Sequence, residues 1–132
     1  MHHVGYVTAS IAASIGEYAG ATSLVWDGQI THDPLQMASV AFLRSDDERA
    51  CSVELVEPAG HRSPVKRFLE TGGGLHHICM EVIDLPAHIA ASTAAGCTLV
   101  RVPLAAVAFG GRKVAWITTP TGQLIELLSC TA

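Results

Sequence analysis

The chain has 132 residues, a length that suits a single domain with a core of its own. Charged residues are sparse, and the net charge of −4 argues against nucleic acid or an anionic membrane surface as the main partner. No apolar run is long enough to cross a bilayer and no signal peptide is visible, so we expect a cytoplasmic protein without a membrane partner.

The first half of the sequence predicts the element order β-α-β-β-β. Residues from His3 onward alternate in character as in a strand, and Ser10 is placed to cap a helix that ends near Gly20. A polar loop is expected through His32-Asp33-Pro34. The strands expected after the helix lie at residues 22–27, 40–44 and 52–57.

A linker of about residues 59–74 is expected to join the two halves. Ser63 is a typical N-cap and Pro64 suits a first helical turn, so a short helix is expected there. The run Gly72-Gly73-Gly74 is not followed by the Lys-Ser or Lys-Thr of a phosphate loop. We therefore interpret it as a hinge before the next strand.

The second half repeats the order β-α-β-β-β. Asp84 is placed to cap a helix that Gly96 ends. The expected strands lie at residues 76–82, 98–101, 112–118 and 124–129, with a Gly-containing loop over 102–111. The chain is therefore predicted as one domain, residues 1–132, made of module one (about 1–58), the linker, and module two (about 75–132).

Each half carries a His pair on its first strand and a Glu on its last. The pairs are His2-His3 and His76-His77, and Glu54 and Glu126 follow them at nearly equal distances. Adjacent strand residues point to opposite faces, so only one His of each pair is expected to reach the Glu side. A carboxylate between apolar strand neighbours is costly unless it is paired or bound to a metal.

Two imidazoles and two carboxylates suit a divalent ion such as Zn, Co, Ni, Mn or Fe(II). Such a set leaves a position open for water or substrate, which is typical of a catalytic site. For any one of these residues alone, an ordinary role in a strand is the better interpretation, but the repeated spacing of all four favours the metal. The four Cys residues form no C-x-x-C pair and are expected to be buried free thiols, with Cys79 on the same strand face as His77.

These motifs resemble the vicinal oxygen chelate superfamily, which includes glyoxalase I, methylmalonyl-CoA epimerase, extradiol dioxygenases and bleomycin-resistance proteins. The most specific motif is Gly74-Leu75-His76-His77. Weaker support comes from His3-Val4-Gly5, Val53-Glu54-Leu55 and Ile125-Glu126-Leu127. The resemblance spans nearly the whole chain and implies an α+β fold. In that fold two βαβββ modules form a curved, open-barrel sheet around a metal site.

Carried over residue by residue, the resemblance implies a ligand set for Zn, Co, Ni or Mn that takes the second His of each pair. The implied ligands are His3, Glu54, His77 and Glu126. The family accepts Gln or Glu at the position of Glu54. Superfamily members also dimerise, so a homodimer is expected.

The resemblance further implies a metal-dependent isomerase, epimerase or lyase that acts through an enolate and is similar to methylmalonyl-CoA epimerase. Such epimerases use a carboxylate from a strand that matches residues 37–43, and this chain has no acid there. We therefore expect Glu126 to act as both ligand and base. A glyoxalase I-type lactoylglutathione lyase shares the same ligands and is the alternative. The expected substrate is a small molecule, an acyl-CoA thioester or a glutathione adduct.

Two more distant functions remain open at this point. An extradiol-type dioxygenase needs two His and one carboxylate on Fe(II), and Glu54 as a fourth ligand argues against it. A metal-free antibiotic-binding protein does not need the His and Glu set at all.

For substrate contacts we nominate Phe109, Arg112 and His76. The segment Phe109-Gly110-Gly111-Arg112 is rich in Gly and suits a loop that closes over a ligand, and Arg112 suits a carboxylate or phosphate. A solvated strand-edge charge is an equal interpretation of Arg112. His76 suits an outer-sphere or proton-transfer role, or simple packing.

Overall fold

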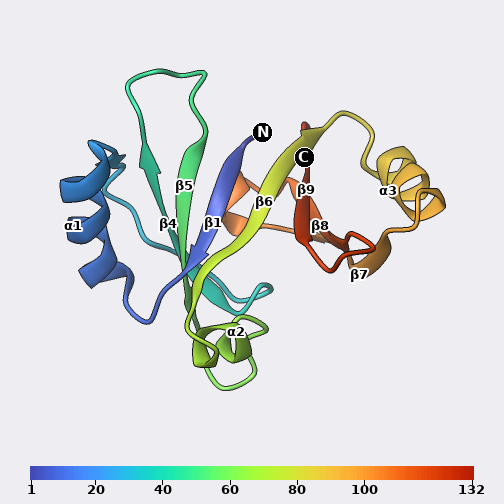
Figure 1. Cartoon of the computed structure of the whole chain (residues 1–132). Coiled ribbons are helices and arrows are strands. Elements are labelled where there is room, and N and C mark those ends of the chain that lie inside the picture. The colour runs from blue at the N-terminus through green and yellow to red at the C-terminus, as the bar shows by residue number, and fades with distance from the viewer.

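Nine strands form one curved, unclosed sheet in this computed structural model, which describes residues 1–132 (Figure 1). The strands are β1 (His3–Val7), β2 (Val25–Trp26), β3 (Thr31–Asp33), β4 (Ala38–Arg44), β5 (Ser52–Pro58), β6 (Gly74–Val82), β7 (Thr98–Ala105), β8 (Lys113–Thr118) and β9 (Leu124–Ser129). The helices are α1 (Ile11–Thr22), α2 (Lys66–Glu70), α3 (Leu85–Ala94) and the 3-10 helix η1 (Val107–Phe109). The predicted α+β class and curved, open sheet are confirmed.

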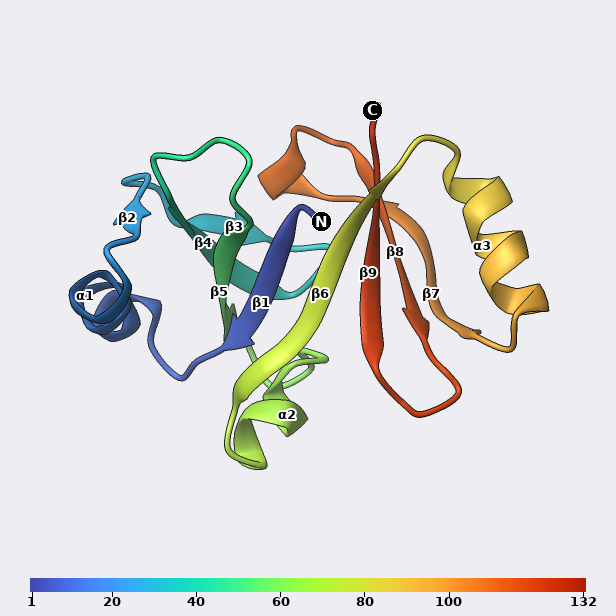
Figure 2. The ribbon, with the colours of Figure 1, turned by 45° about the horizontal axis from the view of Figure 1, so that its top comes forward.

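The sheet has an internal pseudo-twofold arrangement. Its strand order is β2-β4-β5-β1-β6-β9-β8-β7, with β3 beside β4. The central strands β1 and β6 are antiparallel, and each has a parallel partner from its own half, β5 or β9. Helices α1 and α3 lie at the outer ends of the two halves (Figure 2). The strands that frame the two His-Glu pairs are therefore neighbours at the middle of the sheet.

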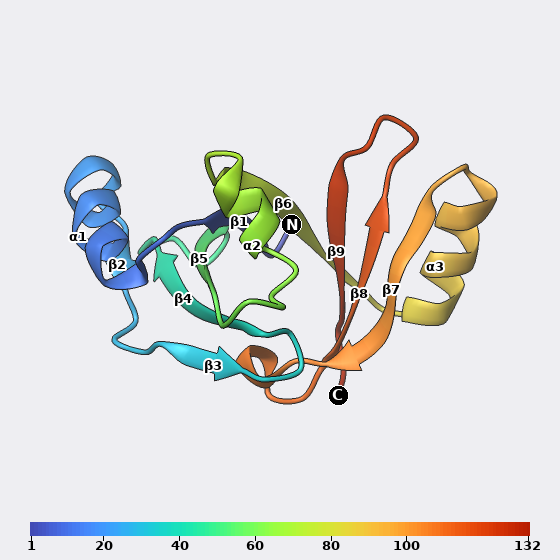
Figure 3. The same cartoon turned by 90° about the horizontal axis from the view of Figure 1, so that it is seen from below.

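The two halves differ at their outer edges. In the second half β7 pairs along the whole of β8, from Thr98 to Ala105. In the first half that place is shared by β2, at one end of β4, and β3, at the other (Figure 3). The predicted loops at His32-Asp33-Pro34 and at 102–111 were thus partly wrong, because pairing with β4 or β8 draws these polar or Pro-containing segments into the sheet.

Capping was predicted correctly at two helices and incorrectly at the third. The side chain of Ser10 accepts a hydrogen bond from Ala13 N, and that of Asp84 accepts one from Ala87 N. The short helix α2 begins only at Lys66, and the hydroxyl of Ser63 is buried without a partner. Ser63 instead takes part in a turn in which its carbonyl accepts from Lys66 N, at 3.1 Å.

The alternation along β5 and β9 sorts apolar from acidic side chains. Leu55 packs under α1 with Ile11, and Leu127 packs under α3 with Leu85. The Glu residues between the apolar positions point to the other, concave side of the sheet. All four cysteines are free, but only Cys79 is fully buried and Cys130 is exposed, so the expectation of buried thiols holds only in part. No helix has the length and apolar character needed to cross a membrane.

Candidate metal centre

The same strand register places one His and one Glu in each half. In the parallel pair β1–β5, Glu54 lies opposite Gly5, two residues beyond His3. In the parallel pair β6–β9, Glu126 lies opposite Cys79, two residues beyond His77. A two-residue offset keeps the side chain on the same face of the sheet. Each Glu therefore shares its face with the His of its own half.

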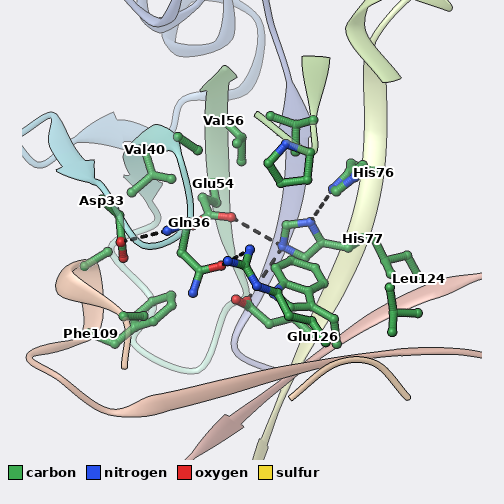
Figure 4. A pocket seen from close by; sticks show the side chains of 18 residues that line it. Asp33, Gln36, Val40, Glu54, Val56, His76, His77, Phe109, Leu124 and Glu126 are labelled. Atoms are coloured by element: carbon green, nitrogen blue, oxygen red, sulfur yellow. Dashed lines mark hydrogen bonds and ion pairs between the residues drawn. The ribbon is translucent and has the colours of Figure 1, made fainter. Parts of the chain in front are cut away.

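The four predicted ligands meet at one point, and Figure 4 shows three of them, Glu54, His77 and Glu126. Nε2 of His3 lies 3.2 Å from Oε2 of Glu54 and 3.1 Å from Oε2 of Glu126. Nε2 of His77 lies 3.3 Å and 3.7 Å from the same two oxygens. The two Nε2 atoms are 3.1 Å apart. All four residues are buried. The structure thus brings together the whole predicted set.

Burial and charge act against each other at this cluster. Desolvation lowers the pKa of His3, but the charge of Glu54 and the close contacts of His3 with the carboxylates of Glu126 and Glu54 outweigh it and raise the pKa to about 9. Burial raises the pKa of Glu54, but the charge of His3 and hydrogen bonds from His3 and His77 lower it to about 2. Without a metal, His3 is therefore a cation held between carboxylates at neutral pH.

The donor atoms fit a divalent transition metal. Ligand atoms of His3, His77 and Glu126 all lie within 4.8 Å of one another, and Glu54 joins this trio through its contacts with both His residues. Oε2 of Glu126 is buried and receives no hydrogen bond of good geometry. A buried carboxylate oxygen without a donor is costly, and a cation satisfies it. Nitrogen and oxygen donors in this ratio suit Zn, Co, Ni or Mn.

Gly5 is a site residue that the sequence reasoning quoted but did not explain. It is paired with His77 across the β1–β6 seam. A Cβ added at Gly5 would stand 2.0 Å from Cε1 of His77, far inside any real contact. The open space at position 5 therefore houses the His77 ring. The signal lay in the His-x-Gly spacing, but only the strand pairing shows which ring needs the space.

A pocket of about 240 Å³ opens onto three of the four ligands, Glu54, His77 and Glu126. Its walls are mainly apolar, from Ala38, Val40, Val56, Val65, Val100, Ala106, Ala108, Phe109, Trp116 and Leu124. Phe109 stacks on the His3 ring with centroids 5.7 Å apart, and Trp116 meets the His77 ring edge-on at 4.7 Å. Such walls exclude water and strengthen electrostatic interactions inside the pocket.

Of the nominated substrate contacts, Phe109 and His76 line this pocket and Arg112 does not. The guanidinium of Arg112 is occupied elsewhere, because it donates to Ser129 O and pairs with Glu81. The cation that does line the pocket is Arg101 on β7. The sequence reasoning missed it, although Arg101 lies between Val100 and Val102, the same pattern that drew attention to Glu54.

Arg101 and its neighbours connect the two halves across the pocket. One terminal nitrogen donates to Leu35 O at 2.7 Å and the other to Oε1 of Gln36 at 3.3 Å. Nε2 of Gln36 is buried and has no acceptor. Asp33 also lines the pocket, but its carboxylate accepts from three backbone amides, those of Leu35, Gln36 and Val107. Asp33 is therefore committed to the backbone, whereas Gln36 retains a free donor.

Both members of the second His pair face the pocket, contrary to the expectation that only one would. On β6, His77 pairs with Gly5 and Leu75 pairs with Tyr6, which leaves His76 as the extra residue of a β-bulge. The bulge interrupts the alternation of side chains, so His76 and His77 line the same cavity. Burial, with a smaller effect of His77, lowers the pKa of His76 to about 4, and the ring is neutral at pH 7.

Comparisons with known proteins agree with this geometry. Residues 2–116 match the profile of the Glyoxalase/Bleomycin resistance protein/Dioxygenase superfamily. The chain is 33% identical over 79 residues to a mitochondrial methylmalonyl-CoA epimerase of Dictyostelium discoideum, covering 57% of this chain and 47% of the relative. It is 31% identical over 87 residues to an ethylmalonyl-CoA/methylmalonyl-CoA epimerase of Cereibacter sphaeroides, covering 64% and 62%. The matched regions thus span only about half to three-fifths of these relatives.

Solved structures show the same fold over the whole chain. A hypothetical protein from Bacillus halodurans superposes with a TM-score of 0.86 at 26% identity, covering 100% of this chain and 94% of the other. Methylmalonyl-CoA epimerase from Mycobacterium tuberculosis gives 0.83 at 24% identity, with 99% and 87% covered. The matching profile, which covers most of the chain, and the shared fold make this protein a member of the glyoxalase/bleomycin resistance protein/dioxygenase superfamily.

Proposed function

We propose that this protein is a metal-dependent enzyme that moves the α-proton of a carbonyl or thioester substrate through an enolate, as an epimerase or isomerase. The observation that carries the proposal is the convergence of His3, Glu54, His77 and Glu126 beside an apolar pocket that three of them line. When bound there, a divalent ion supplies Lewis acidity that stabilises the enolate oxygen. Both halves of the site come from one chain, which supports pairing of the modules within a chain.

Glu126 is the residue we propose as the base. Oε2 of Glu54 and Oε2 of Glu126 both lie near the two His nitrogens, but only that of Glu126 is buried without a hydrogen bond of good geometry. Glu126 lines the pocket, so its carboxylate faces the space that a substrate enters. A carboxylate in this position takes the α-proton and returns it. The surrounding apolar walls keep water from competing for that proton.

A glyoxalase-type lyase is the second candidate, and one observation favours it. The β4 residues that line the pocket are Ala38 and Val40, so no carboxylate from that strand faces Glu126. Asp33 is bound to three backbone amides and is not free to act. One base that removes and returns a proton on the same side of the substrate suits transfer between neighbouring carbons better than inversion.

Arg101 and Gln36 are the groups we propose for substrate orientation. Arg101 is the one Arg or Lys side chain among the lining residues, and it suits an anionic substrate group. The free amide donor of Gln36 suits a carbonyl oxygen. The names of the relatives point to acyl-CoA thioesters, and a methylmalonyl-CoA epimerase from Streptomyces coelicolor was solved with 2-nitronate-propionyl-CoA. A carboxylated acyl-CoA is thus the first substrate to test, and a glutathione hemithioacetal the second.

The test is an α-proton exchange assay in deuterated buffer. Protein purified without chelator is analysed for metal, then loaded separately with Zn, Co, Ni and Mn and given methylmalonyl-CoA or the hemithioacetal of glutathione. Deuterium at the α-carbon of methylmalonyl-CoA supports the epimerase, and product from the glutathione hemithioacetal supports the lyase. A loaded protein that exchanges neither, or one that binds iron and consumes oxygen with a catechol, contradicts the proposal. The expected homodimer stays a prediction that sedimentation velocity checks.

A further inference from the structure

Each of the two proposed His ligands is hydrogen-bonded to the His that precedes it. Nδ1 of His2 lies 2.8 Å from Nδ1 of His3. Nδ1 of His76 lies 2.9 Å from Nδ1 of His77, as the dashed line in Figure 4 shows. The contact therefore occurs twice, once in each half, between the same atoms. This repetition accounts for both members of the His pairs, of which a ligand set alone uses one.

We propose that His2 and His76 are positioning residues that fix the tautomer and orientation of His3 and His77 as metal ligands. The inference rests on the metal centre proposed above. Nε2 of each inner ring faces the carboxylates, so a neutral inner ring that binds metal must carry its proton on Nδ1. That proton then needs an acceptor, and in both halves the nearest one is Nδ1 of the preceding His.

Each outer ring is itself held in place. His2 is tied by its backbone amide to Cys79 O at 2.8 Å, and its ring meets Phe109 edge-on at 5.4 Å. His76 is the bulge residue of β6, and its ring meets Phe68 edge-on at 4.8 Å. Water in the same place would provide an acceptor without a fixed position. An anchored imidazole provides an acceptor at a fixed position.

The two outer rings differ in one useful respect. His76 lines the pocket, whereas His2 is not among the lining residues. A change at His2 therefore tests the effect on the metal without touching the substrate space. A change at His76 combines the two.

The experiment measures zinc affinity and imidazole tautomers in the full chain. The variants His2→Phe and His76→Phe keep a ring but remove the acceptor, whereas His2→Asn and His76→Asn keep an acceptor near the same position. Loss of an outer-sphere partner is expected to weaken zinc binding about 10- to 100-fold in each Phe variant. The Asn variants should recover most of that loss. His88→Phe, on the exposed side of α3, is the control and should bind zinc like the unchanged protein.

Long-range proton–nitrogen NMR of the zinc-loaded protein gives a readout that packing alone does not move. We expect zinc on Nε2 and a proton on Nδ1 in His3 and His77. Zinc on Nδ1 or unchanged affinity in both Phe variants would overturn the inference. So would zinc bound by His2, His3 and Cys79, whose ligand atoms also lie within 4.8 Å of one another. If zinc binds tightly and its affinity does not depend on His2 or His76, the proposed function stands and this inference fails. A protein that binds none of the four metals loses both.

Discussion

The two halves bring matching ligands to the centre but surround them differently. Beyond His3 the second residue is Gly5, and beyond His77 it is Cys79. Gly5 leaves room for the His77 ring, whereas Cys79 lies fully buried opposite His3 in the β1–β6 pairing. A repeated motif therefore produces a symmetric ligand set whose supports are not interchangeable. Equivalent substitutions in the two halves should have unequal effects, and this inequality is open to test.

The largest difference is expected between the two carboxylates. Glu126→Gln should lower α-proton exchange by about 10²- to 10⁴-fold, because an amide cannot take up the proton. Glu54→Gln keeps an oxygen ligand and leaves the proposed base intact, so exchange should fall much less. Exchange is followed by NMR in deuterated buffer, with bound metal measured in parallel. If the two variants lose activity equally, the assignment of the base to Glu126 is wrong.

The next largest effect is expected at Gly5. Gly5→Ala places a methyl group where Cε1 of His77 lies, so the ring or the strand must move and zinc affinity should fall about 100-fold. Cys79→Ala, at the equivalent position, removes volume and adds no clash, so its zinc affinity should change little. Gly16→Ala in α1 meets nothing within 4 Å and serves as the control for the substitution itself. Zinc titration distinguishes the three, and normal binding by Gly5→Ala would contradict the described ring position.

A smaller effect is expected from the two arginines of the second half. Arg101→Gln removes the pocket's cation and should lower kcat/KM for a carboxylated substrate roughly tenfold or more, the value of one charge-assisted hydrogen bond. Arg112→Gln, outside the pocket, should leave kcat/KM nearly unchanged. The comparison uses steady-state kinetics with carboxylated and uncharged thioesters. If Arg101→Gln lowered kcat/KM equally for both thioesters, Arg101 would support the fold and would not recognise the substrate carboxylate.

A further effect, which needs no substitution and changes zinc affinity by at most about tenfold per pH unit, is a pH dependence that originates in module one. The pKa of His3 in the metal-free protein is about 9, so a proton must leave before metal binds at neutral pH. Zinc affinity should therefore rise with pH up to about 9, by at most about tenfold per pH unit. The raised pKa also stabilises the metal-free fold at pH values below the ordinary 6.5 of His, and this contribution is lost as pH rises through 9.

At the acid end the sign is reversed for Glu54. The pKa of Glu54 in the folded protein is about 2, below the ordinary value of 4.5. The ionised carboxylate therefore stabilises the metal-free fold above pH 4.5, and this contribution is lost as the pH falls toward 2. The His3–Glu54 pair should thus contribute most to the stability of the metal-free protein between pH 4.5 and pH 6.5, as measured by thermal unfolding. A melting temperature that rises from pH 6.5 to 9 would contradict the described pairing.

The sequence predicted what depends on alternation and repetition. Glu54 and Glu126 lie between apolar neighbours in strands whose other face packs under a helix, so their convergence followed from the pattern. Features that depend on pairing between distant strands did not follow. The strand at Thr31–Asp33 exists because β4 offers it hydrogen bonds, and the role of Gly5 depends on a ring 72 positions away in the sequence.

Arg101 and Arg112 show the same limit at the level of single side chains. Both lie near the glycine-containing turn before β8, and composition alone does not distinguish them. Glu81 on β6 and the carbonyl of Ser129 occupy Arg112 on one side of the sheet. The partners of Arg101, Leu35 and Gln36, belong to the other half of the chain. Only the folded arrangement shows which guanidinium faces the cavity.

The single extra residue in β6 sets how this protein tolerates change in length. Because side chains alternate with a period of two, deletion of Ile78 would restore a regular ladder and turn His77 toward the opposite face, whereas deletion of His76 would straighten the strand and leave His77 opposite Gly5. Deletion of Ile78 should therefore abolish the ligand set, whereas deletion of His76 should remove only the hydrogen-bond partner of His77. A scan of single-residue insertions and deletions along β6 would therefore test whether the number of residues in this strand matters more to the site than their identity.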